Sequence, residues 1–331
     1  MTRFIMPDLM HAHHGDIRRV GVEMEMAGLH LSRIADLVAS VFQGHVVPRS
    51  AFEIHVEGSE YGSFTVELDA SLLKDHAYRP FLTKFGINPD EVQEQRIDLL
   101  LARLAEGIVP SEVVSPPMPL SALDEMDLLR AKLHQAGAKG TRAALVYAFG
   151  VQFNVEVASL EVAYLRDMLR AYVLLHEHLS KRGTVDLSRK ISPYIRPFPG
   201  GYVRLILAEE YAPSQTGLIQ DYLGHNPTRN RPLDMLPLFA HLDEDRVFSA
   251  PVESHLIKPR PAFHYRLPNS QIDEPEWSLA LPWNDWVMVE KLAQDKDRLA
   301  VYSRTYLEQP GEILAGLIDE WVDMLGSWFK P

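Results

Sequence analysis

The chain has 331 residues, of which 46% are hydrophobic and 24% are charged, a composition typical of a globular protein with one large or two modest domains. A net charge of -12 argues against a broad surface for nucleic acid or membranes, and the lack of cysteine excludes disulfides, thiolate zinc sites and cysteine nucleophiles. We expect a cytoplasmic protein, because no signal-peptide pattern and no apolar run of ~20 residues is present.

The chain is predicted to begin with an N-terminal arm over residues 1–17, followed by a single domain over 18–331. The arm contains a histidine-rich run, His11 to Asp16. This run could bind a transition metal, but such a segment is more often a solvated terminus.

The stretch from Arg18 to Gly28 is predicted to be a β-strand. Its apolar residues alternate with polar ones, which places on one face Val20, Val22, Met24 and Met26. Glu23 and Glu25 face the other way, roughly 7 Å apart, and repel each other unless a cation binds between them or one is protonated. Carboxylate oxygens suit a hard cation such as Mg²⁺. The alternative is a half-solvated strand with its glutamates in water.

The same pattern recurs in three later stretches that contain no lysine or arginine, namely 63–69, 111–115 and 151–157. The polar side chains on their shared face are Glu67, Asp69, Glu112, Gln152, Asn154 and Glu156. A merely solvated sheet face usually mixes charges of both signs. An acid-and-amide face across four strands therefore indicates a place where metal ions are held.

Further elements follow from helical spacing or strand alternation. Helices are predicted over 31–42, 121–135, about 160–179, 233–241, 283–299 and 312–328, and strands over about 45–57 and 261–267. A helical excursion is expected at about 70–107, and Gly44 and Gly137 are expected to end the helices before them. No P-loop, dinucleotide-binding glycine pattern, zincin helix or nucleophile elbow is present.

From residue 190 onward the sequence is rich in proline, glycine and arginine, and two loops are predicted over 196–204 and 226–232. Their arginine, asparagine and glycine content suits anion binding, because guanidinium groups grip phosphate oxygens and glycine lets backbone amides approach. Ordinary loops with solvated arginines are the alternative. The residues of interest here are Arg204, Asn226, Arg229 and Arg231.

Five motifs occur in an order that resembles the amidoligase family of carboxylate–amine ligases. They are Gly21-Val22-Glu23-Met24-Glu25, Phe64-Thr65-Val66-Glu67-Leu68-Asp69, Glu112-Val113-Val114-Ser115-Pro116-Pro117, Gly200-Gly201-Tyr202-Val203-Arg204 and Asn226-Pro227-Thr228-Arg229-Asn230-Arg231-Pro232-Leu233-Asp234. The resemblance covers about 18–290. It implies an α+β fold like the catalytic domain of glutamine synthetase, in which a curved, largely antiparallel sheet forms a half-barrel with helices packed outside.

The resemblance also implies ATP with Mg²⁺, or Mn²⁺ in its place, as cofactors. By motif match, the expected metal ligands are Glu23, Glu25, Glu67 and Glu112. The expected catalytic residues are Arg204, Arg229 and Glu112. The expected nucleotide-binding residues are Gln152, Asn154, Arg204, Asn226, Arg229 and Arg231. Relatives often carry histidine where this chain has Gln152 and Asn154, and an amide there can bind Mg²⁺ or the nucleotide.

The resemblance, together with the acidic sheet face, therefore favours an ATP- and Mg²⁺-dependent carbon–nitrogen ligase that forms an amide bond through an acyl phosphate. The substrates would be a small-molecule or peptide carboxylate and an amine, with no nucleic acid or membrane partner. Phosphoryl transfer depends on positioning and charge neutralisation, so it needs no protein nucleophile. One alternative is a metal-dependent hydrolase that uses the same acidic face, and another is a non-catalytic binding protein on a degenerate ligase fold.

Overall fold

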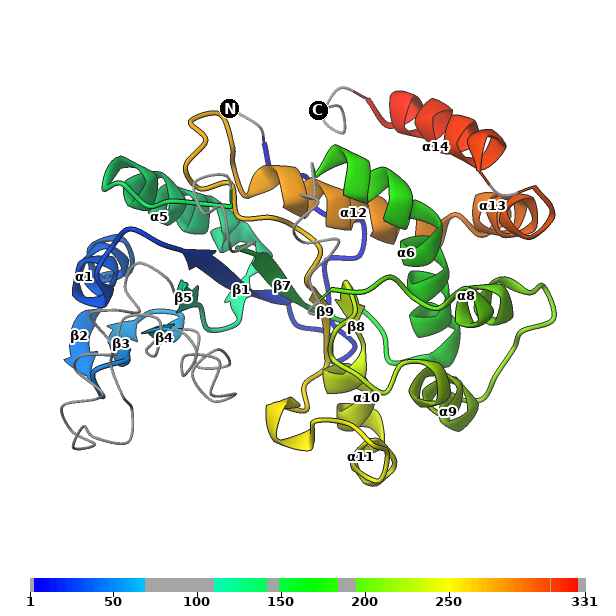
Figure 1. Ribbon diagram of the computed structural model, residues 1–331, viewed down its shortest axis with the longest axis horizontal. Coiled ribbons are helices and arrows are strands. Elements are labelled where there is room, and N and C mark those ends of the chain that lie inside the picture. Colours follow the sequence, from blue (N-terminus) through cyan, green and yellow to red (C-terminus); the bar gives the residue numbers. More distant parts are fainter. Residues whose placement is uncertain (1–2, 69–109, 142–148, 184–194, 310, 327–331) are drawn as a thin grey trace, which may run out of the picture.

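One antiparallel sheet crosses the centre of the computed structural model, which describes residues 3–68, 110–141, 149–183, 195–309 and 311–326 (Figure 1). Within these residues the strands are β1 (Arg19–Met26), β2 (His45–Pro48), β3 (Glu53–Ser59), β4 (Gly62–Leu68), β5 (Ser111–Val114), β6 (Met118–Pro119), β7 (Val151–Glu156), β8 (Leu233–Asp234) and β9 (Ala262–Tyr265). Their order is β2-β3-β4-β5-β1-β7-β9-β8, and β6 pairs with the start of β1. The sheet is antiparallel and is not closed. Together with the helices described next, it confirms the predicted mixture of helices with an antiparallel sheet.

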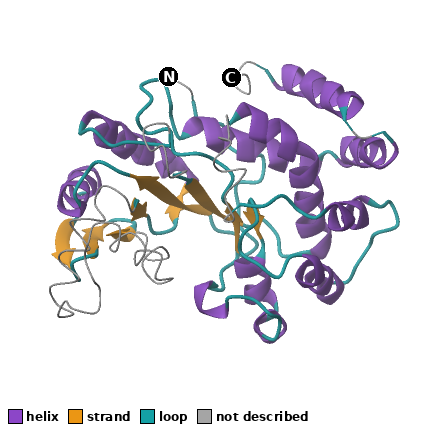
Figure 2. Cartoon of the chain, viewed as in Figure 1, coloured by secondary structure: helices purple, strands orange, loops and turns teal. Residues whose placement is uncertain are grey.

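The helices cover the sheet and its ends (Figures 1 and 2). The described helices are α1 (Leu31–Phe42), η1 (Leu120–Ala122), α5 (Leu123–Gln135), α6 (Val162–Arg182), α8 (Gly200–Leu207), α9 (Gln215–His225), α10 (Leu236–Leu242), α11 (Glu244–Phe248), η2 (Ser254–Leu256), α12 (Ala280–Gln294), α13 (Lys296–Glu308) and α14 (Glu312–Leu325). None of them is long and apolar enough to cross a lipid bilayer.

The apolar face of β1 packs against the helix layer, as its alternation predicts. Val20, Val22, Met24 and Met26 are all fully buried. Aromatic side chains continue this core across the neighbouring strands. Phe153 of β7 lies edge-on to Trp283 of α12, with ring centroids 5.8 Å apart, and Tyr265 of β9 packs against Tyr172 of α6 and Trp286 of α12. The opposite face of the sheet is therefore the one that carries the acidic side chains.

The helix layer also buries a charge cluster next to β1. Arg18, which is 0% exposed, donates two hydrogen bonds to Glu290 of α12, from Nη2 to Oε1 over 2.6 Å and from Nη1 to Oε2 over 2.9 Å. Its Nε donates to the carbonyl of Glu156 and Nη1 also donates to the carbonyl of Leu9, while the indole of Trp286 donates to Glu290. This cluster joins the N-terminal segment, β1, β7 and α12.

The N-terminal segment lies along α12 ahead of that cluster. The backbone of Ile5 donates to Asn284 and accepts from the indole of Trp283, and Asn284 donates to the carbonyl of Arg3. Phe4 is buried. The first described residues are thus held by polar contacts on both sides of a buried aromatic ring.

A helix occupies part of a region that the sequence interpretation assigned to a loop. The predicted loop over 196–204 contains the first part of α8, and α9 follows it. The glycine pair 200–201 suggested a turn, yet Pro199 precedes the helix as its N-cap, and an apolar side of α8 is buried through Tyr202, Val203, Ile206 and Leu207. Tertiary burial outweighs the low helix propensity of glycine here. The loop over 226–232 is confirmed.

Smaller corrections concern element boundaries. The predicted strand over 45–57 is a hairpin of β2 and β3, because the chain turns after Pro48 and Glu53 accepts hydrogen bonds from the backbone of Arg49 and Ser50. Helix α1 ends at Phe42, and its C-cap Gln43 adopts a left-handed conformation with φ 56°. Gly44 is required for a different reason, because a Cβ there would lie 2.7 Å from the side chain of Val56.

The C-terminal part is divided differently from the prediction. The helix predicted over 283–299 is two helices, α12 and α13, because Asp295 breaks the run and caps α13 by accepting from the backbone of Arg298. The helix predicted over 233–241 begins as the short strand β8. Asp69 and the helical excursion at about 70–107 lie outside the described residues.

Candidate functional site

Four glutamates from four adjacent strands lie in one cross-strand row. Glu53 of β3 is directly opposite Glu67 of β4, Glu67 is opposite Glu112 of β5, and Glu112 is opposite Glu25 of β1. Directly paired residues have Cβ atoms about 4.5–5.5 Å apart and project from the same face. The register therefore brings together three of the glutamates predicted as metal ligands and adds Glu53, which the sequence interpretation did not select.

This acidic row places like charges next to one another, which destabilises a sheet. Glu25 is held by the backbone of Gly150, which donates to Oε2 over 2.6 Å, and by Gln152, which donates to Oε1 over 3.3 Å. No group of three or more histidine, aspartate or glutamate side chains in the described part of the chain is arranged to hold a metal ion on its own. A cation here would therefore need further oxygen ligands from water or substrate.

Glu23 lies one pleat further along β1, on the same face, and contacts a chain of polar groups. Asn154 donates from Nδ2 to Glu23 Oε1 over 2.6 Å, and Arg260 donates from Nη2 to Asn154 Oδ1 over 2.6 Å. Burial would raise the pKa of Glu23, but the charges of His264, Arg260 and Arg266 and the hydrogen bond from Asn154 lower it. Glu23 is therefore ionised at neutral pH.

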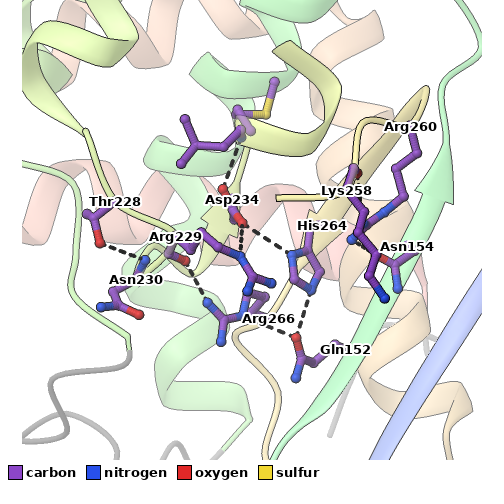
Figure 3. A network of polar contacts seen from close by, with 12 residues as sticks. Gln152, Asn154, Thr228, Arg229, Asn230, Asp234, Lys258, Arg260, His264 and Arg266 are labelled. Carbon is purple, nitrogen blue, oxygen red and sulfur yellow. Dashed lines mark hydrogen bonds and ion pairs between the residues drawn. The ribbon is translucent and has the colours of Figure 1, made fainter. Parts of the chain in front are cut away.

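A buried network surrounds His264, a residue that the sequence interpretation did not select (Figure 3). The imidazole Nε2 is 2.7 Å from Gln152 Oε1 and 4.0 Å from Glu23 Oε2, and Nδ1 is 3.3 Å from Asp234 Oδ2. Arg266 donates from Nε to the same oxygen of Gln152 over 3.1 Å. Gln152 thus links the glutamates of β1 to a histidine–aspartate pair on β9 and β8.

Burial controls the charge states in this network. It lowers the pKa of His264 to about 4, although Asp234 and Glu23 act in the opposite direction. Burial would raise the pKa of Asp234, but the hydrogen bond and charge of His264 and the charges of Arg229 and Arg266 hold it below its usual value. Asp234 is therefore ionised at neutral pH, and the nearby Arg229 and Arg266 balance its charge.

Three arginines flank this network: Arg229 and Arg266 lie together beside Asp234, and Arg260 lies on the other side of His264, next to Asn154 (Figure 3). Arg266 donates from Nη1 to the carbonyl of Arg229 over 2.6 Å, and Arg229 Nε is 3.7 Å from Asp234 Oδ2. Burial lowers the pKa of Arg260 and Arg266, and each also feels the positive charge of Arg229. Guanidinium groups that flank one polar network raise the local positive potential and favour an anion at this face. We refer to Arg229, Arg260 and Arg266 as the arginine cluster.

The other predicted binding residues have different surroundings. Arg231 and Asn226 are buried, and Arg231 donates to Asn226 Oδ1 over 2.8 Å and to the carbonyl of Pro197 over 2.9 Å, which fastens the loop 226–232 to the preceding segment. Arg204 is exposed on α8, which packs mainly against α6, α9 and α13. No hydrogen bond or ion pair joins Arg204 to the arginine cluster within the described residues.

Of three comparisons with known proteins, one finds a match to this chain. No curated protein and no solved structure matches the chain. A family model matches residues 16–288, a range that contains every described strand, the acidic row and the arginine cluster. Because the match covers most of the sequence, this chain belongs to the family described as putative amidoligase enzyme.

Proposed function

We propose that the chain is an ATP- and Mg²⁺-dependent ligase that joins a carboxylate to an amine through an acyl phosphate. The observation that carries this proposal is the shared sheet face, on which the acidic row continues into Glu23, Gln152 and the arginine cluster. Such a face can hold metal-bound phosphates at one end and a free anionic group at the other. We also propose that the sheet is of the glutamine synthetase type.

The acidic row suits Mg²⁺ by its donor chemistry. Mg²⁺ usually keeps several waters and binds through one or two carboxylates together with substrate phosphates, so a preformed cage of protein ligands is not needed. In this proposal Glu25, Glu67 and Glu112 hold the metal, with Glu23 beside them. Bound Mg²⁺ would neutralise phosphate oxygens and so lower the barrier to phosphoryl transfer.

The arginine cluster would hold the transferring or bound phosphoryl group. Its guanidinium forks match phosphate oxygens bidentately, and their partial burial strengthens the electrostatic interaction. Arg229 keeps the role predicted for it from the sequence, and Arg260 and Arg266 join it because they contact Asn154 and Gln152. The carboxylates of the same face can accept the proton that the attacking ammonium group must lose.

The proposed mechanism predicts where one oxygen atom of the substrate carboxylate goes. The substrate carboxylate takes the γ-phosphoryl group from ATP and ADP leaves; the amine then attacks the carbonyl carbon, and phosphate leaves with one former carboxylate oxygen. With the carboxylate labelled by heavy oxygen, one labelled atom should appear in the released phosphate. Phosphate without label, or release of AMP, would contradict the mechanism.

Binding of nucleotide provides an independent test. The acidic row should repel ATP unless a divalent cation is present. Calorimetric titration should therefore detect ATP binding in the presence of Mg²⁺ and none after a chelator is added. Equal affinity with and without chelator would contradict the metal-bridged arrangement. A metal-dependent hydrolase on the same face would act without ATP, so the same titration separates the two activities.

A further inference from the structure

A cavity lies on the helix side of the sheet, away from the acidic row. It has a volume of about 140 Å³ and is bounded by the end of α6, the chain after β9 and the start of α12. Its apolar lining includes Leu179, Leu267, Trp277 and Leu281. An apolar cavity of about 150 Å³ can hold a molecule of the size of benzene. The lining therefore offers space for one small apolar group.

Strand alternation separates this cavity from the proposed active site. Tyr265 and Leu267 line the cavity, whereas Arg266 between them contacts Gln152 on the acidic face. Tyr265 also packs against Trp286 in the helix layer, with ring centroids 5.5 Å apart. A ligand in the cavity would therefore not compete with a nucleotide bound on the acidic face.

The charged part of the lining is one ion pair, formed by Arg182 and Asp285, and the amide side chains of Asn269 and Gln271 also line the cavity. Both side chains are 7% exposed, and Arg182 donates from Nε to Asp285 Oδ1 over 2.6 Å. In the described part of the chain, the buried Nη2 group of Arg182 has no hydrogen-bond partner and Asp285 Oδ2 accepts no hydrogen bond. The pair thus leaves one donor and one acceptor at the edge of an apolar cavity.

The ion pair is neutral overall, and this determines which ligand it can accept. A charged ligand would bring a second charge into a largely apolar space, where only one opposite charge is present and already paired. An uncharged carboxamide has an oxygen that can accept from Arg182 and an N–H group that can donate to Asp285. Burial raises the pKa of Asp285 to about 6 despite Arg182, so above this pH the carboxylate is ionised and can accept.

We propose that this cavity binds a small uncharged molecule that carries a primary carboxamide on an apolar body. The site is independent of the proposed ligase activity, since its residues lie on the other side of β9 from the arginine cluster. Its ligand would be recognised by the hydrogen-bonding groups of Arg182 and Asp285 and by contact with Trp277 and Leu267.

The first experiment uses the full chain at pH 8 without ATP. Benzamide, benzoate and benzylamine, which share the same ring, are titrated by calorimetry and by saturation-transfer NMR. Benzamide should bind, and the two charged probes should bind at least about tenfold more weakly because of their desolvation. Binding of benzoate or benzylamine as tight as that of benzamide, or no binding of benzamide, would overturn the proposal.

Variants assign the binding to the cavity. Arg182→Gln should weaken benzamide at least about tenfold, because a charge-assisted hydrogen bond is lost. Lys181→Gln removes the same charge from the adjacent, exposed residue, which pairs with Glu177, and should leave the affinity unchanged. If Arg182→Gln does not fold, Leu281→Trp tests the same point, because the larger side chain should fill the cavity and abolish binding. Unchanged affinity in a folded Arg182→Gln or Leu281→Trp variant would overturn the assignment.

Discussion

Buried charged groups are paired to different extents on the two faces of the sheet. On the helix side, Arg18 and Glu290 form a bidentate pair whose remaining hydrogen bonds go to backbone carbonyls and an indole. On the acidic side, the buried Nε atoms of Arg229 and Arg260 have no hydrogen-bond partner among the described residues. Charges that are fully paired hold elements together, whereas incompletely paired donors can bind a ligand at little structural cost.

The difference is also one of composition. The helix-side cluster matches one guanidinium with one carboxylate, while the acidic side gathers like charges, with four glutamates in the acidic row and three guanidiniums in the arginine cluster. Neighbouring like charges repel one another and destabilise the folded chain unless groups of opposite charge neutralise them. The four predictions below follow from this contrast, in order of expected effect.

The largest effect should come from breaking the paired cluster. Glu290→Ala leaves Arg18 buried without its carboxylate, and loss of one partner of a buried pair costs about 3–5 kcal/mol of unfolding free energy. Glu290→Gln should cost less, because the amide oxygen still accepts a hydrogen bond. Denaturant unfolding of the three proteins measures the difference, and a loss below about 1 kcal/mol in Glu290→Ala would contradict the structural role.

The second prediction concerns pH and His264. Its pKa of about 4 in the folded chain is below the unfolded value of about 6.5, so the unfolded state binds more protons between these values. Stability should therefore fall as the pH decreases from 6.5 to 4, by up to about 3 kcal/mol from this group. His264→Gln should lack this part of the slope. Unfolding curves at pH 7 and pH 4.5 test it, and equal slopes for both proteins would contradict it.

The third prediction removes one charge from the acidic row. Glu25→Gln should lower ligase turnover roughly 100-fold, as does loss of a single preorganised electrostatic group in other enzymes. The fold should remain, because repulsion with Glu112 decreases and the new side chain can still accept from Gly150. A thermal melt and an ADP-release assay give the two readouts, and full activity would exclude a metal role for Glu25.

The smallest effects on turnover are expected from replacing two arginines by lysine. Arg266→Lys keeps the charge but loses the fork that contacts Gln152 and Arg229, so turnover should fall about tenfold, by more than ATP affinity. Arg204→Lys separates two interpretations: the motif match predicts a loss of turnover, whereas its exposure on α8 predicts almost none. Steady-state kinetics of both variants decides between them.

Alternation along single strands was predictable from the sequence, and pairing between strands was not. The apolar and acidic faces of β1 follow directly from the period of two, and so does the separation of Glu23 and Glu25 from the buried residues. The opposition of Glu67 and Glu112 depends on the strand order β4-β5-β1, which joins segments far apart in the chain. No local pattern encodes that register.

His264 shows which site residues were missed and why. It lies on the strand predicted over 261–267, between Phe263 and Tyr265. The alternation therefore predicts that His264 faces away from those two aromatic side chains. Its partners Asp234 and Gln152 come from two other strands, and a lone histidine gave no motif. Arg204 illustrates the converse, because a glycine pair in front of an arginine suggested a binding loop where burial forms helix α8.

The buried pair of Arg18 and Glu290 has a consequence for the order of events during synthesis. The two residues are 272 positions apart, so Arg18 leaves the ribosome long before its carboxylate exists. At roughly 5–20 residues per second the delay is on the order of tens of seconds. Until then β1 cannot settle against the helix layer without an uncompensated charge. Nascent chains that stop before α12 should therefore stay protease-sensitive, and the central strand should be among the last parts to become protected.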